Sequence, residues 1–369
     1  GCQVSHFSAF ASLTLDWLGL SHSGVQDLGP LVTQLASSSG TLGALHLARH
    51  TTYLPQPRCV QASFDALASF EALATLDLTG WESLTDISAL SKCRALARLM
   101  FGPCDVSDIR PLSCCTRLHT LEVRGSPLTD ISVVSSLSLR NLDVVGSALH
   151  DLSALSSCTE LRTLDLSGCP ITNIRPLSSC HALVEIRLRQ CKATDISWLS
   201  SCVQLRTLDV SSSAVKKLPL VPTLVKLICQ NTPISDITAV SSCTKLRSVD
   251  ITMCKISDVA PLSFCSELDT LRARWCPVRD IDPLSCCCGA LGRLDVTGCS
   301  ISDISPLSSC TALRWVMIPD SGRHCLPSRP DVQIWCGDEE YPEDFEWCSD
   351  SYSNWKYTPR DVRSWALRF

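Results

Sequence analysis

Hydrophobic residues recur along the chain in one short pattern, Leu-x-x-Leu-x-Leu, in which Val or Ile sometimes replaces a later leucine. The first leucine of this pattern stands at fourteen positions: 15, 42, 73, 96, 118, 139, 161, 183, 205, 224, 246, 268, 291 and 313. Most of the spacings are 22 residues. Within one unit, Leu164 and Leu166 alternate with polar residues, which is the period of a half-buried strand. The pattern therefore predicts one short strand in every unit of a repeat protein.

The second half of each unit predicts a tight turn rather than a second strand. In the unit that begins at Leu161, the apolar residues Ile171, Ile174 and Leu177 are spaced three apart. An Asp or Asn precedes the middle one, where its oxygen can accept a hydrogen bond from turn backbone and start a one-turn helix. The same position is occupied by Asp108, Asp130, Asp151, Asn173, Asp195, Asp236, Asp258, Asp280 and Asp303. Stacking such units gives a curved solenoid with a parallel sheet on its concave face.

These motifs resemble those of leucine-rich repeat proteins. The run Ile-x-Asp-Ile-x-Pro-Leu is most similar to the 22-residue repeats of internalins and of a leucine-rich phosphatase regulatory subunit. Cysteine in place of the usual asparagine is similar to repeats of flagellated protists and of F-box relatives. The resemblance covers about residues 13–318. It implies an α/β horseshoe with a parallel concave sheet and short helical or 3-10 turns on the convex face.

The last 51 residues differ in composition from the repeats, because they hold nine of the 21 aromatic residues. The end of a solenoid must be covered to bury its open edge. We therefore divide the chain into a solenoid of about 14 repeats, residues 1–318, and a C-terminal aromatic cap or extension, residues 319–369. The alternative is that this segment reaches a neighbouring molecule.

Composition narrows the class of protein further. A hydrophobic content of 45% and a net charge of −5 exclude a disordered chain and make direct nucleic-acid binding unlikely. With neither a secretory signal nor a long apolar segment visible, we expect an intracellular, cytoplasmic or organellar protein. Gly1 and Cys2 would match a lipidation motif if an initiator Met preceded them, and only then do we expect membrane contact. The alternative is a truncated or processed start.

The 24 cysteines fall mostly at two phases of the repeat. Six lie eight residues after the first leucine: Cys104, Cys169, Cys191, Cys254, Cys276 and Cys299. Nine lie three residues before it: Cys93, Cys115, Cys158, Cys180, Cys202, Cys243, Cys265, Cys288 and Cys310. We expect both sets to be small buried residues. Disulfides between stacked units are disfavoured, because equivalent side chains lie about 4.8 Å apart and project in parallel.

A metal site is not expected in the repeats, which contain no Cys-x-x-Cys pair. One alternative lies outside the two phases, a zinc site made by His324, Cys325, Cys336 and Cys348. These spacings match no standard ligand pattern, so packing within the cap is favoured.

Charged residues form columns on the exposed side of the predicted strands. The middle column is mainly acidic, and the column one residue after the first leucine is often basic, so we expect the two to neutralise each other. Arginine and aromatic residues that interrupt this pattern predict a partner-binding site. They are Arg187, Arg189, Arg272, Arg274, Trp275, Arg293, Trp315 and Met317. The alternative for Trp315 and Met317 is that they dock the cap.

No catalytic constellation is visible, because the histidines are scattered and there is no phosphate-binding Gly-rich loop. We expect no enzyme activity, no cofactor and no small-molecule substrate. The leading hypothesis is a protein-binding or structural subunit of a large intracellular assembly, such as a ciliary or ribonucleoprotein complex. The alternative is a regulatory or substrate-adaptor subunit of a phosphatase or ubiquitin ligase. An extracellular receptor is disfavoured, since no Asn begins a glycosylation site.

Overall fold

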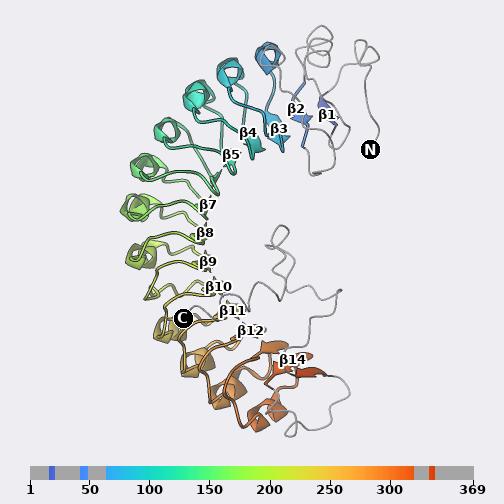
Figure 1. Ribbon diagram of the computed structural model, residues 1–369, viewed down its shortest axis with the longest axis vertical. Coiled ribbons are helices and arrows are strands. Elements are labelled where there is room, and N and C mark those ends of the chain that lie inside the picture. The colour runs from blue at the N-terminus through green and yellow to red at the C-terminus, as the bar shows by residue number, and fades with distance from the viewer. Residues whose placement is uncertain (1–15, 21–41, 49–63, 320–331, 337–369) are drawn as a thin grey trace.

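The protein forms an open arc whose inner side is a single parallel sheet (Figure 1). The computed structural model describes residues 16–20, 42–48, 64–319 and 332–336. Its fifteen strands lie side by side in chain order. They are β1 (Trp17–Gly19), β2 (Ala44–His46), β3 (Thr75–Thr79), β4 (Arg98–Gly102), β5 (Thr120–Val123), β6 (Asn141–Asp143), β7 (Thr163–Asp165), β8 (Glu185–Arg187), β9 (Thr207–Asp209), β10 (Lys226–Ile228), β11 (Ser248–Asp250), β12 (Thr270–Arg272), β13 (Arg293–Asp295), β14 (Trp315–Ile318) and β15 (Gln333–Cys336). This confirms the predicted solenoid.

The convex side is built from short 3-10 helices, one for nearly every unit (Figure 1). They are η2 (Ala66–Ser69), η3 (Ser88–Lys92), η4 (Arg110–Cys114), η5 (Ser132–Ser136), η6 (Ser153–Ser157), η7 (Arg175–Ser179), η8 (Ser197–Ser201), η9 (Thr238–Ser242), η10 (Ala260–Phe264), η11 (Asp282–Cys287) and η12 (Ser305–Ser309). As predicted, the preceding Asp or Asn starts the turn. The backbone N–H of Ser153, for example, donates to Asp151 Oδ1 at 2.8 Å.

The core lies between the two layers and runs the length of the arc. The strand leucines Leu164 and Leu166 are fully buried, as are Ile171 and Leu177 from the convex half of the same unit. Equivalent residues of neighbouring units are in register, with Leu164 opposite Leu142 on one side and Ile186 on the other. Each unit therefore buries its apolar face only against its two neighbours.

Two units depart from this plan. The 19-residue unit that begins at Leu205 has no 3-10 helix between β9 and β10, and its convex segment is extended and contains Pro219 and Pro222. At the C-terminal side, β15 pairs in parallel with β14, so the sheet continues past residue 318. The remaining aromatic residues of the expected cap lie outside the described residues, as do three of the four residues of the alternative zinc site.

Most of the cysteines that lie three residues before the first leucine form a buried column, which we call the turn ladder. Each sulfur points toward a backbone carbonyl of the preceding unit, at distances from 3.2 Å for Cys243 to 3.7 Å for Cys202. Its members are Cys93, Cys115, Cys158, Cys180, Cys202, Cys243, Cys265 and Cys287. Burial raises the pKa of Cys180 to about 12, which keeps this thiol protonated at neutral pH.

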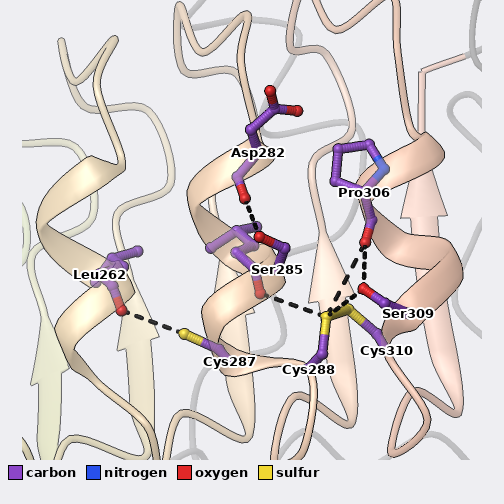
Figure 2. Close-up of a disulfide and its surroundings, with 9 residues drawn as sticks. Leu262, Asp282, Ser285, Cys287, Cys288, Pro306, Ser309 and Cys310 are labelled. Carbon is purple, nitrogen blue, oxygen red and sulfur yellow. Dashed lines mark hydrogen bonds between the residues drawn. A yellow bond between two sulfur atoms is a disulfide. The ribbon is translucent and has the colours of Figure 1, made fainter.

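Cys288 has the same phase and is buried as expected, but it forms a disulfide with Cys310, although disulfides between stacked units were expected to be disfavoured. Helix η11 is six residues long, whereas its neighbours η10 and η12 have five. The additional residue places Cys287 in the ladder, where its sulfur lies 3.2 Å from the carbonyl oxygen of Leu262. Cys288 is thereby freed to form a disulfide with Cys310 (Figure 2).

The cysteines that lie eight residues after the first leucine form a second buried column close to the strand ends, which we call the strand-end ladder. Cys169 and Cys191 lie 3.2 Å and 3.1 Å from the carbonyl oxygens of Val144 and Leu166, the last strand leucine positions of the preceding units. Several units have a buried hydroxyl residue instead: Ser126, Ser147, Ser213 and Thr232. The prediction of a small buried side chain is confirmed for both ladders.

Candidate functional site

The concave face is the candidate site, because most of its strands present a polar residue between buried apolar residues. The middle column is acidic at seven of the fourteen units, and several of these carboxylates are buried. Asp209 is 3% exposed, Asp250 5% and Asp295 fully buried. Each of the three carboxylates accepts the backbone N–H two residues further on, as Asp209 Oδ1 does from Ser211 at 3.0 Å. These aspartates therefore stabilise the backbone at the ends of the strands through hydrogen bonds.

Strand β8 and the residues after it bring two arginines into this acidic column. Arg187 lies 3.7 Å from Asp165 of the preceding strand, and Arg189 lies 3.8 Å from Asp209 of the following strand. Arg187 also pairs with Glu185 on its own strand. A pair of arginines two residues apart thus bridges three consecutive units.

The same arrangement recurs at β12. Arg272 lies 3.2 Å from Asp250 of the preceding strand, and Arg274 lies 3.6 Å from Asp295 of the following strand. We call the pairs Arg187/Arg189 and Arg272/Arg274 the two arginine forks. The sequence identified all four residues as interruptions, but only the fold shows that both forks use the same neighbours in the same order.

The predicted neutralisation between the acidic column and the basic column was wrong. Arg140 and Arg247 of the basic column instead form ion pairs with Glu160 and Glu267, each just before the first leucine of the following unit. The reason is geometric, since a residue one position after the first leucine lies at the start of the strand, away from the middle column.

Arg124 is a member of the acidic column's network that the sequence analysis missed. Its guanidinium bridges Glu122 at 3.5 Å and Asp143 at 2.6 Å. It occupies the position equivalent to Arg189 and Arg274, two residues after the middle column. This shared position in the repeat could have identified Arg124 from the sequence.

The remaining predicted site residues lie in different environments in the structure. Arg293 lies on β13, 3.5 Å from Asp269, and Trp315 is half-buried on β14. Trp275 is 46% exposed beside the second fork. Met317 is only 5% exposed and pairs in register with Trp335 of β15, which favours the alternative that Met317 docks the C-terminal segment.

Burial shifts the acid–base behaviour of two carboxylates in this network. Loss of solvent raises the pKa of Asp209, against the lowering effect of its hydrogen bonds from Ser211 and of Arg189. Burial likewise raises the pKa of Asp143, opposed by Arg124. The ionised form of Asp209 is thus favoured by Ser211 and by Arg189, and that of Asp143 mainly by Arg124.

Two other kinds of site are absent from the described part of the chain. Within it, no helix is long and apolar enough to cross a bilayer, and no group of three or more metal-ligating side chains comes together. The lipidation candidates Gly1 and Cys2 lie outside that part.

The repeat and its arc agree with comparisons to known proteins. A family model described as "Leucine Rich repeats (2 copies)" matches residues 137–179, and one described as "Leucine Rich repeat" matches residues 242–260. The chain therefore has the leucine-rich repeat fold, with family-model matches in two of its segments. Its fold is similar to that of internalins, as comparison with solved structures shows. A search of curated protein sequences found no match.

Three solved structures illustrate the likeness. Internalin InlF from Listeria monocytogenes has 20% identity and a TM-score of 0.62, with 88% of this chain and 82% of that chain covered. The functional domain of InlJ from the same organism, which includes a cysteine ladder, has 21% identity and a TM-score of 0.66 over 82% and 62%. The plant peptide hormone receptor RGFR1, in complex with RGF2, has 16% identity and a TM-score of 0.58 over 89% and 64%. The chain thus spans less than two thirds of the last two.

Proposed function

We propose that this protein is a non-catalytic binding module whose concave face receives a protein partner. The observation that carries the proposal is the concave sheet itself, a rigid surface on which half-buried arginines interrupt a column of buried aspartates. Side chains held by ion pairs on a fixed backbone lose little conformational entropy when a partner binds. The fold supports this use, since one structural neighbour is a peptide hormone receptor.

The finer proposal is that the partner belongs to a larger intracellular assembly in which this protein is a stable subunit. The exposed Trp275 beside the second fork supports a binding role, because Trp and Arg are enriched among residues that dominate interface energies. A regulatory or adaptor role for a phosphatase or ubiquitin ligase is the alternative.

Affinity purification with mass spectrometry tests the proposal when it is combined with variants that block one face. Thr207→Arg and Ser248→Arg place bulky charges at half-buried positions of β9 and β11 on the concave face. Ser178→Arg and Ser200→Arg are controls that place the same charges at exposed positions of η7 and η8 on the convex side. We expect the concave variants to lose a partner that the controls retain.

Two results would contradict this proposal. Equal recovery of the same partner by concave and convex variants, with folding confirmed by circular dichroism, would exclude the concave face. Recovery of a monomer alone under mild conditions would exclude the stable-subunit form.

A further inference from the structure

The two arginine forks are related by a fixed translation along the sheet. They follow β8 and β12, which are separated by β9, β10 and β11 in a sheet whose strands lie in chain order. Four strand steps correspond to about 19 Å at the usual spacing. Both forks project from the same two positions of their units, so their guanidinium groups face the same side.

In each fork the arginines are nearer to solvent than their aspartate partners, whereas Glu185, which also pairs with Arg187, is 27% exposed. The side chains of Arg187, Arg189, Arg272 and Arg274 are 29%, 26%, 19% and 22% exposed. Their aspartate partners, in the same order, are 14%, 4%, 6% and 0% exposed. A molecule lying on the concave face therefore meets guanidinium groups, which offer a planar array of N–H donors suited to carboxylates.

We propose that the forks bind an extended polypeptide segment that carries two acidic side chains six residues apart. An extended chain advances about 3.3 Å per residue, so six residues span about 20 Å, which matches the distance between the forks. Because side chains of a strand alternate between its two faces, an even separation points both carboxylates at the sheet. This inference rests on the proposed function and names the chemistry of its partner.

The strands between the forks restrict the middle of the segment. β9 and β11 present the aspartates of the middle column, whereas β10 has the buried Ile228 in that column and Lys226 two residues before it. A carboxylate at the third or fifth residue of the segment would approach Asp209 or Asp250 and be repelled. The favoured segment is therefore acidic at its two ends and uncharged between them.

Fluorescence anisotropy with labelled synthetic peptides tests this proposal on the unmodified protein. The probes are peptides of alternating Gly and Thr that contain two Glu residues separated by four, five, six or eight positions. We expect the six-residue spacing to bind at least tenfold more tightly than the five-residue spacing, which turns one carboxylate away. A Glu added at the third position should weaken binding, and added salt should weaken it further.

Variants then locate the peptide. Replacing both arginines of one fork, by Arg187→Gln with Arg189→Gln or by Arg272→Gln with Arg274→Gln, should remove the spacing preference and weaken binding about tenfold. The matched control is Arg140→Gln with Arg247→Gln, which removes the same charge at the rim of the sheet. Circular dichroism verifies folding, and the peptide series remains decisive if a fork variant fails to fold.

The outcomes separate this inference from the proposed function. Equal affinity for all spacings, or no peptide binding, would overturn the inference, and continued concave-face capture of a protein would leave the proposed function intact. A single-stranded oligonucleotide of equal charge that competes as well as the six-residue peptide would also overturn it, since the forks would then be recognising charge alone.

Discussion

At the scale of the residue, the two cysteine ladders use sulfur in different ways. In the strand-end ladder, Cys254, Cys276 and Cys299 approach carbonyl oxygens to 2.9, 2.9 and 3.0 Å. In the turn ladder the corresponding distances are longer, for example 3.4 Å for Cys180. Units that lack a cysteine differ in the same way. Hydroxyl residues replace cysteine in the strand-end ladder, whereas apolar residues, such as Leu137 and Val221, replace it in the turn ladder.

Serine should therefore be tolerated in one ladder and not in the other. Cys169→Ser keeps a donor for the Val144 carbonyl and should change the free energy of unfolding by less than about 1 kcal/mol. Cys180→Ser buries a hydroxyl in a position suited to an apolar group and should cost about 1–3 kcal/mol. Urea denaturation of the two variants measures the difference, and equal costs would refute the distinction.

The exposed aspartates that start the 3-10 turns make folding sensitive to acid. Hydrogen bonds from the backbone and hydroxyl of the residue two positions on lower the pKa of Asp151, Asp195 and Asp303. A lowered folded-state pKa contributes stability that is present above the unfolded value of about 3.9 and is lost as pH falls through the folded value.

Replacing these three aspartates with asparagine should make the free energy of unfolding less dependent on pH in the acid range. Asparagine can keep the turn, as Asn173 does by accepting the Arg175 N–H at 3.1 Å, but it does not titrate. We expect little change at pH 7 and a smaller loss of stability between pH 5 and pH 2 than in the unmodified protein. Denaturant titrations at several pH values provide the measurement. An unchanged dependence on pH in the acid range would contradict the prediction.

At the scale of the element, a residue with positive φ lies at or shortly after the end of each strand from β3 to β13. Glycine occupies this position in several units, including Gly168 with φ of 75° and Gly298 with φ of 73°. Five consecutive units use other residues there: Gln190, Ser212, Asn231, Met253 and Trp275, with φ between 52° and 59°. This conformation costs a non-glycine residue about 1–2 kcal/mol, so the turn is imposed by the stacking of the units.

Adding a methyl group at two of these glycines should separate backbone strain from packing. At Gly168 a Cβ would lie 3.5 Å from Gly146, so Gly168→Ala should cost only the backbone term of about 1–2 kcal/mol. At Gly298 a Cβ would lie 2.3 Å from Cε3 of Trp275, which forces the indole to move and should add about 1–3 kcal/mol.

A double-mutant cycle with Trp275→Ala measures the packing contribution. If the indole causes the additional cost, Gly298→Ala in the Trp275→Ala background should cost no more than Gly168→Ala does. Equal effects of Gly298→Ala in both backgrounds would contradict this explanation.

At the scale of the whole molecule, stability is distributed unit by unit, because each unit contacts only its neighbours. The disulfide between Cys288 and Cys310 links the segments that precede β13 and β14, and the two cysteines are 22 residues apart in the chain (Figure 2). A loop of this length gives a stabilisation of about 3 kcal/mol in the chain-entropy description.

Removing the disulfide should therefore weaken the C-terminal units without affecting distant ones. For Cys288→Ser with Cys310→Ser we expect faster amide exchange in β13 and β14 and unchanged exchange in β4 to β7. The matched control is Cys114→Ser with Cys286→Ser, because both of these thiols are free and exposed. Uniformly faster exchange along the arc would show that the solenoid unfolds as one unit.

By itself, the sequence determined the repeat, the strand in each unit, the turn that begins at an Asp or Asn, and the burial of most cysteines. These follow from local spacing, because every unit repeats the same contacts with its neighbours. It also identified the four fork arginines as interruptions. The tertiary structure alone decided which charges meet, because the partners of Arg189 and Arg274 lie one unit further on. It also decided the placement of Cys287 and Cys288, since one additional residue in η11 changes which thiol faces the core.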